Sequence, residues 1–374
     1  MARQGQDGAR PSSDASPCAA RRPHLPIRGQ MPIHPPVGSI ECDGQRRSPA
    51  PWRRRKVRVV VLAVAVCALT SGLVVAPPHT VAADASSRMV DTSPVHDPTL
   101  TNDRRHASPE GEANATLAYW TDKRLRAAEP DSDSPSTFDP ISTDSTIVHS
   151  VVGSIASVPW VGTLSFVRDG RDRRCSAAAI QSDSGLMVAT AGHCLVSNGH
   201  YATSVAFTPG WDGKSKPYGV WATDTYQVPP EWSIREDDSH DVAFVKVIPH
   251  PGRSLEAVTN APPADFAIAK ATLHYFSLSY ANIGGGFGPR PLATCVGPAY
   301  TVRAERSLAM IGCSAAPGMS GGAVYHVSST APKGTQVGVI SRNIETANGP
   351  GTVFTPFGDV ELLVFRLVDS FRRS

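Results

Sequence analysis

Three short motifs carry residue types suited to nucleophilic catalysis: TAGHC around His193, SHDVAF around Asp241 and PGMSGGA around Ser320. A serine hydroxyl is a weak nucleophile at its free pKa and must pass its proton to an adjacent base as it attacks. An imidazole can act as that base and later protonate the leaving group, while a carboxylate holds the imidazole in the right tautomer. Taken singly, such histidines, aspartates and glycine-flanked serines are more often structural, so the inference depends on the combination.

In the order His, Asp, Ser, these motifs resemble those of the chymotrypsin (trypsin-like) peptidase family, with TAGHC for its TAAHC, HDVAF for its DIAL and GMSGGA for its GDSGGP. The resemblance covers about 147–374. It implies a serine endopeptidase that cuts protein or peptide substrates through a His193, Asp241 and Ser320 triad and an acyl-enzyme. It also implies that the N–H groups of Gly318 and Ser320 form an oxyanion hole, in which one donor typically lowers the barrier by ~3 kcal/mol.

The same resemblance suggests the residues of the substrate pocket. Ser314 lies six positions before the nucleophile, where trypsin-like members have an aspartate. Ser341, Arg342 and Asn343 lie on a predicted strand that lines the pocket and pairs with the substrate backbone, and Ser341 is expected to donate to Asp241. Two interpretations of Arg342 stay open, an exposed side chain or a charge that favours acidic substrates. Without the aspartate, we expect weak cleavage after Lys or Arg.

Three alternatives compete with this interpretation. A G-x-S-x-G nucleophile elbow needs an acid and then a histidine after the serine, but the only later histidine is His326, in an apparent strand. No H-E-x-x-H motif occurs, so neither a metal nor a cofactor is expected. The remaining alternative is a catalytically silent homologue that acts as a binding module, although the intact triad and the double glycine argue against such decay.

The elements around the motifs are predicted to be strands. Short β-rich runs separated by Gly, Pro and Asn predict one all-β domain over 147–374, and by resemblance two six-stranded antiparallel barrels. The runs are WVGTLSFV, CSAAAI, LMVATAG, SVAFTPG, DVAFVKV, AIAKATLHYF, SLAMIGCS, GGAVYHV, TQVGVIS and TVFTPF. Apolar residues at a 3-4 spacing predict a C-terminal helix from Asp359 to Arg372, with an apolar face of Val360, Leu363, Val364, Leu367, Val368 and Phe371.

The chain has seven cysteines, and four of them follow the candidate export signal. Four cysteines allow three pairings. The simplest pairing makes two local loops, Cys175–Cys194 and Cys295–Cys313, each contributing roughly 3 kcal/mol to stability. Four free thiols are the alternative, although an oxidising compartment favours disulfides.

The first part of the chain is expected to direct export. Residues 1–58 are predicted to form a disordered basic segment, and the true start is open, since Met31 is a second candidate. Residues 59–83 are predicted to be a signal peptide or a membrane anchor, because the apolar run 59–76 follows a basic cluster and precedes small residues. As a retained transmembrane helix it would anchor the chain to the membrane; as a cleaved signal it would leave the protein extracellular. The peptidase domain lies outside the cytoplasm in both cases.

Residues 84–146 are predicted to be a linker or pro-segment. Within them, Thr121 and Asp122 can cap a short helix running to Ala128, which either packs on the domain or belongs to a pro-region. Activation is expected to differ from that of trypsin-like zymogens, because the position before the nucleophile holds the uncharged Met319. A new N-terminus at Val151 would find no carboxylate there, so any pro-segment is expected to act by occlusion or by assisting folding.

Net charge does not indicate a nucleic-acid partner. The formal charge is only +3 and the pI is about 8.5. The one dense basic cluster, at 53–58, adjoins the apolar run instead of lying within the β-rich domain. Protein or peptide substrates are therefore the expected partners.

Overall fold

The computed structural model describes residues 109–131, 137–138, 141–142, 149–211, 213–267, 269–281, 292–328 and 331–372. All of these belong to one compact unit within 83–374. The predicted basic segment and the predicted signal or anchor lie outside the described residues. Among the described helices, none has the length and apolar character needed to cross a membrane.

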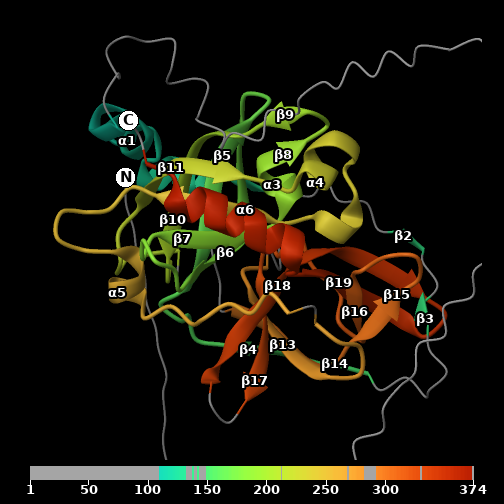
Figure 1. The fold of residues 1–374 in the computed structure, drawn as a ribbon. Helices are drawn as coiled ribbons and strands as arrows, with labels where there is room; N and C mark the ends of the chain where they lie inside the picture. The colour runs from blue at the N-terminus through green and yellow to red at the C-terminus, as the bar shows by residue number, and fades with distance from the viewer. Residues whose placement is uncertain are drawn as a thin grey trace, which may run out of the picture. The chain divides into compact units, whose positions relative to one another are not determined.

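A closed barrel of six antiparallel strands forms the first half of the domain (Figure 1). Its order is β6-β5-β10-β11-β12-β7, and pairing of β6 with β7 closes it. The strands are β5 (Val161–Arg168), β6 (Arg171–Ile180), β7 (Met187–Thr190), β10 (Thr203–Pro209), β11 (Trp221–Gln227) and β12 (Ala243–Val247). The two-residue turn Asp169-Gly170 joins β5 to β6 with positive φ at both positions, as hairpin turns of this length require.

A second sheet wraps around its own apolar core. Six of its strands follow the order β16-β19-β18-β17-β13-β14, and the first and last approach each other where Cys295 Sγ lies 3.9 Å from Met310 Sδ. Further pairings add β4, β15 and the short β2 and β3. The strands are β2 (Thr137–Phe138), β3 (Ile141–Ser142), β4 (Val151–Ile155), β13 (His274–Ser279), β14 (Leu292–Pro298), β15 (Tyr300–Val302), β16 (Leu308–Ile311), β17 (Ala323–Ser328), β18 (Ala331–Thr346) and β19 (Gly349–Pro356). The predicted all-β fold is confirmed.

Short elements and two disulfides connect the strands. Cys175–Cys194 and Cys295–Cys313 pair as the simplest pairing predicted. The first links β6 to α3, and the second links β14 to the residues after β16. The short elements are α3 (Gly192–Leu195), β8 (Val196–Ser197), β9 (His200–Tyr201), α4 (Pro230–Arg235), the 3-10 helix η2 (Asp238–His240) and α5 (Leu255–Thr259).

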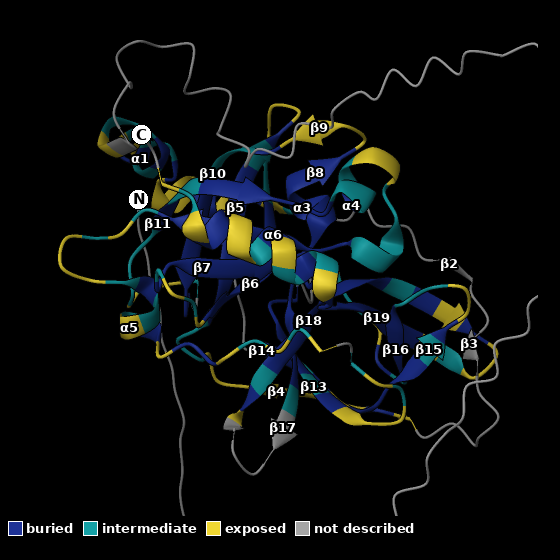
Figure 2. Cartoon of the chain, viewed as in Figure 1, coloured by how far each residue is buried: buried dark blue, intermediate teal, exposed yellow. Residues whose placement is uncertain are grey.

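The predicted C-terminal helix is α6 (Asp359–Ser370), but its predicted apolar face is wrong in part. Val364 and Val368 are buried, whereas Leu363 and Leu367 are 67% and 39% exposed. The outer face of α6 is correspondingly exposed in Figure 2. Glu361 takes an inward position because its carboxylate binds His240 and Arg306 at 2.7 and 3.3 Å. An ion-pair network thus replaces part of the expected apolar contact.

The segment before the domain also has structure. It forms α1 (Pro109–Tyr119), α2 (Asp122–Ala127) and β1 (Glu129–Pro130). Thr121 caps α2 by accepting the N–H of Arg124 at 3.3 Å, as the sequence indicated. Trp120, Leu125 and Ala128 are buried against Ala206 and Trp211 of the first barrel region. Residues 109–131 therefore pack on the barrel.

Candidate active site

His193 lies in the one-turn helix α3, directly after the apolar strand β7. Its side chain is buried, and its Nδ1 lies 2.8 Å from Asp241 Oδ2. The backbone N–H of His193 donates to the other carboxylate oxygen, also at 2.8 Å. The disulfide of the adjacent Cys194 ties α3 to β6. One hydrogen bond thus orients the imidazole, while the backbone hydrogen bond and the disulfide hold the helix that carries it.

Asp241 lies between η2 and β12 and is 1% exposed. Ser341 Oγ donates to Asp241 Oδ2 at 2.6 Å, the contact that the sequence predicted. Burial alone would raise the pKa of Asp241, but the His193 charge and the hydrogen bonds from His193 and Ser341 outweigh it and lower the pKa. Burial would likewise lower the pKa of His193, but the carboxylates of Asp241 and Asp131 raise it overall.

Ser320 lies in the turn before β17. Its carbonyl accepts the N–H of Ser176 on β6 at 2.8 Å, which docks the turn on the first barrel. The described contacts include no hydrogen bond between Ser320 Oγ and His193 Nε2, and this nitrogen is buried. Catalytic hydrogen bonds are often long without substrate and shorten when it binds. The structure therefore brings His193, Asp241 and Ser341 together and places Ser320 on an adjoining turn.

The backbone around Ser320 is shaped by glycines. Gly318 and Gly321 have φ values of +88° and +77°, which other residues rarely adopt. The carbonyl of Gly318 accepts the hydroxyl of Ser176 at 2.8 Å, which holds that peptide in place. Among the described residues, the N–H groups of Gly318 and Ser320 have no hydrogen-bond acceptor. Two donors are thus available for a developing oxyanion.

Two of the predicted pocket residues, Ser314 and Asn343, lie at the loop before Ser320, whereas Arg342 is buried among acidic side chains. Asn343 receives the N–H of Ala315 and donates to its carbonyl, both at 2.6 Å, so its amide bridges β18 and the loop before Ser320. Ser314, next to Ala315, is exposed and places no charge there. The interpretation of Arg342 as an exposed side chain is wrong. It is 4% exposed because Glu305 and Asp238 bind its guanidinium at 2.7 and 3.6 Å.

Several residues around the site were not predicted from the sequence. Ser176 holds both Gly318 and Ser320, and its position beside a predicted disulfide cysteine was the available signal. Trp232 donates to Val196 O at 2.8 Å, and its ring centroid lies 6.4 Å from that of His193. The partners of Glu361 are 55 and 121 residues away in sequence. Nothing local in the sequence marks such a contact.

Among the described residues, one group of potential metal ligands includes His193. Donor atoms of Asp131, Cys175, His193 and Cys194 lie within 4.8 Å of one another. Both sulfurs are in a disulfide, and the Asp131 carboxylate is bound by Arg168 at 2.9 Å. This donor set does not suit a metal ion.

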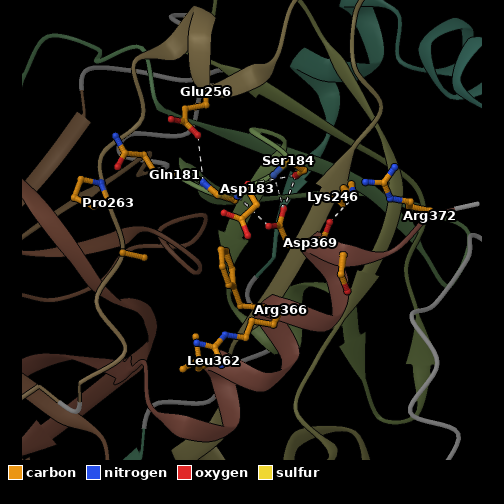
Figure 3. A pocket seen from close by; sticks show the side chains of 14 residues that line it. Gln181, Asp183, Ser184, Lys246, Glu256, Pro263, Leu362, Arg366, Asp369 and Arg372 are labelled. Atoms are coloured by element: carbon orange, nitrogen blue, oxygen red, sulfur yellow. Dashed lines mark hydrogen bonds between the residues drawn. The ribbon is translucent and has the colours of Figure 1, made fainter.

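A separate hollow of about 1160 Å³ lies between α6 and the β6–β7 turn (Figure 3), and no triad residue lines it. Asp369 accepts the N–H groups of Asp183 and Ser184 at 3.1 and 3.3 Å. Lys246 donates to the Asp369 carbonyl at 2.6 Å. These contacts fasten the end of α6 to the barrel, so the hollow has a structural explanation.

Comparisons with known proteins point in one direction. Residues 175–331 match the family described as trypsin-like peptidase domain. The solved structure of the protease Anisep from Arthrobacter nicotinovorans is 26% identical, with a TM-score of 0.53 over 59% of this chain and 100% of its own. The thermostable serine protease AL20, from an extremophilic microorganism, is 27% identical, with a TM-score of 0.51 over 57% of this chain and 98% of its own.

A curated relative is similar over a shorter stretch. The "Extracellular metalloprotease" of Bacillus subtilis is 25% identical over 124 residues, which are 32% of this chain. The match spans 39% of that protein's length, well under two thirds of it.

Proposed function

This chain belongs to the trypsin-like serine peptidase family and is a protease, and from that premise we propose that it is a secreted endopeptidase that works through His193, Asp241 and Ser320. The observation that carries the proposal is the buried His193–Asp241 pair, in which one carboxylate binds both the ring and the backbone N–H of the histidine at 2.8 Å. That arrangement fixes Nδ1 as the protonated nitrogen and leaves Nε2 to act as the base.

The first chemical step forms an acyl-enzyme. Ser320 Oγ attacks the substrate carbonyl while its proton passes to His193 Nε2. The carbonyl oxygen becomes an oxyanion, which the N–H groups of Gly318 and Ser320 stabilise. His193 then protonates the leaving amine, and the peptide C–N bond breaks. Water attacks the resulting ester with His193 again as base, which releases the acid and restores Ser320.

These roles set the direction of the substrate. The acyl side lies toward the second sheet, where Ser314 and Asn343 flank the space before the nucleophile. The leaving amine must face His193, so the leaving side extends toward β6 and the first barrel. The substrate chain therefore runs from the second sheet to the first barrel.

Export is part of the proposal. The apolar run 59–76 and the basic residues before it support it. Two disulfides within the domain also support it, because disulfides persist mainly in oxidising compartments. Whether the chain is released or stays anchored would follow from the N-terminal sequence of the exported protein.

A peptide library tests the proposed activity and its specificity together. We expect internal cleavage that Ser320→Ala abolishes, with weak cleavage after Lys or Arg because Ser314 provides no carboxylate. Asn343 is hydrogen-bonded to Ala315, the neighbour of Ser314, so Asn343→Gly is expected to loosen this loop and to admit larger side chains. Strong preference for Arg would contradict the specificity, and the absence of Ser320-dependent cleavage would favour the silent homologue.

A further inference from the structure

The first part of β6 extends beyond its pairing with β7 and leaves a free edge, which strand β1 occupies beside the nucleophile turn, the turn that carries Ser320. It pairs in parallel with β6 at Arg173 and Arg174, and the N–H of Asp131 extends the pairing with a 2.9 Å bond to the Arg174 carbonyl. Ser176, two residues further along β6, is the residue that holds the nucleophile turn. The N-terminal segment therefore fills the edge along which the leaving side of a substrate would lie.

Asp131 anchors this strand beside the catalytic base. Its carboxylate binds Arg168 at 2.9 Å in an ion pair whose side chains are 0% and 2% exposed. A carboxylate oxygen also lies within 4.8 Å of a ring nitrogen of His193. Arg168 in turn donates to the His193 carbonyl at 2.5 Å. The anchor is thus in contact with the element that carries the base.

Pro130 lies beside the Cα of Gly318, the residue whose N–H group is assigned to the oxyanion hole. A methyl group placed on Gly318 would lie 3.3 Å from Pro130 Cβ and 3.4 Å from Arg174 Nη1. Arg174 is 1% exposed and donates to the Ala128 carbonyl at 3.1 Å. This burial lowers the pKa of Arg174 to about 10. The segment therefore covers both the barrel edge and the flank of Gly318.

The segment runs in the direction opposite to a substrate. After β1, the chain next pairs through β2 with β18 at Ile344 and Glu345, also in parallel. These residues begin three positions beyond Ser341, which binds the catalytic aspartate. In chain order, β1 pairs with the first barrel and β2 then pairs with the second sheet, whereas the proposed substrate path runs from the second sheet to the first barrel.

We propose that residues 109–131 are a built-in inhibitor that binds the leaving side of the active site in the reverse direction, with Asp131 bound to Arg168 as its anchor. This inference rests on the proposed function. In a reversed peptide the nitrogen and carbonyl of each bond exchange places, so no leaving nitrogen faces His193. The segment can therefore occupy the site without being cleaved there.

The segment has its own binding surface away from the active site. Tyr119 and Arg124 bind Asp172 at 2.6 and 2.8 Å, and Trp120 donates to the Ser204 carbonyl at 2.5 Å. These contacts lie on β6 and β10, apart from Ser320. Anisep and AL20 are matched over nearly their whole lengths by less than three fifths of this chain. The contacts with Asp172 and the Asp131–Arg168 ion pair give the segment two separate points of attachment to the barrel.

Covalent labelling of Ser320 by a fluorophosphonate tests the anchor in the full chain. Asp131→Asn removes the carboxylate charge and is expected to raise the labelling rate at least tenfold. Glu129→Gln is the matched control, because it makes the same charge change at an exposed position of β1 and is expected to leave the rate unchanged. A rate for Asp131→Asn equal to or below that of the control would overturn the proposal.

A second arm does not depend on how well Asp131→Asn folds. A site for a sequence-specific protease is inserted between residues 144 and 145, the folded chain is cut, and the N-terminal fragment is removed. Added synthetic peptide 109–131 is expected to slow labelling and to stay intact by mass spectrometry, whereas the peptide carrying Asp131→Asn inhibits at least tenfold more weakly. No slowing, or cleavage of the peptide within its bound residues, would overturn the proposal.

Binding of a fluorescent peptide 109–131, followed by anisotropy, separates this inference from the proposed function. Asp131-dependent binding to a cut protein that never reacts with the phosphonate would contradict the peptidase and support the reversed segment. A protein that reacts with the phosphonate but does not bind the peptide would support the peptidase and contradict the reversed segment.

Discussion

Individual charges at the site are held by short, specific contacts. The carboxylate of Asp241 accepts three hydrogen bonds. They come from the ring of His193, from the backbone N–H of His193 and from the hydroxyl of Ser341. Buried carboxylates with several donors are stabilised in the ionised form, which is the form that supports an imidazolium. Asp131 adds a second negative charge near the same ring. The pKa of His193 therefore depends on two carboxylates, one in the domain and one in the N-terminal segment.

The rate of phosphonate labelling is expected to fall on acidification with a midpoint above pH 6.5, the ordinary pKa of histidine. Asp241 and Asp131 outweigh burial and raise the pKa of His193, and a base must be neutral to accept a proton. Protonation on lowering the pH through this raised pKa therefore removes activity. Measured on the full chain, Asp131→Asn should shift the midpoint to lower pH. A midpoint below 6.5, or one that Asp131→Asn raises, would show that this electrostatic account is wrong.

How far the site could be predicted depends on where the signal lies. His193, Asp241 and Ser320 stand in local motifs, and Ser341 follows from the predicted pocket strand. The ion pair of Asp131 and Arg168 could not be predicted in this way. The two residues are 37 positions apart in the sequence, and isolated charged residues are normally expected to be exposed to solvent. Both side chains are buried in the structure, and the ion pair between them offsets part of the desolvation cost of burying each charge.

At the scale of elements, each of the three residues proposed to be catalytic follows or precedes a strand. His193 comes directly after β7, Asp241 comes just before β12, and Ser320 comes just before β17. The β12 and β7 ladder brings the first two together, since Ala243 pairs with Thr190. Strand alternation and turn residues made these elements predictable. The inner face of α6 could not be predicted, because Glu361 on that face is held by partners on η2 and near β16, far from it in the sequence.

The disulfide Cys175–Cys194 is expected to support activity beyond its contribution to stability. It clamps β6 to the turn that carries His193, so the double substitution Cys175→Ala and Cys194→Ala should lower kcat at least tenfold at temperatures where circular dichroism shows a folded barrel. The loss of stability should be about 3 kcal/mol.

Val368→Ala provides the comparison for the disulfide variant. It truncates a buried side chain of α6 away from His193 and should cost about 2 kcal/mol in stability with little change in kcat. Equal loss of kcat in both variants would mean that the disulfide acts through stability alone.

For the molecule as a whole, control of activity is expected to depend on what covers the site rather than on a new N-terminus. Met319 is 5% exposed, packs in the core of the second sheet, and its sulfur accepts the N–H of Ala316 at 3.0 Å. Val151 and Val152 are 69% and 63% exposed in β4, which pairs with β14. We therefore expect activity without a buried ion pair between an N-terminus and the residue before Ser320.

Active-site titration of the cut protein tests this mode of activation. Proteins that begin at Ser145, with or without two additional residues, should titrate equally, and chemical blocking of the α-amine should have no effect. Activity that requires one defined free N-terminus would contradict the account. Burying an ammonium without a partner costs several kcal/mol of desolvation free energy. Because Met319 provides no carboxylate, we do not expect a new N-terminus to insert there.

The most direct test of the central claim is the location of the phosphonate adduct in the cut protein. We expect one adduct per chain, on the peptide that contains Ser320, with labelling reduced by about 10³-fold or more in His193→Ala because the serine then lacks its base. An adduct on another residue, or labelling of Ser320 that does not depend on His193, would contradict it.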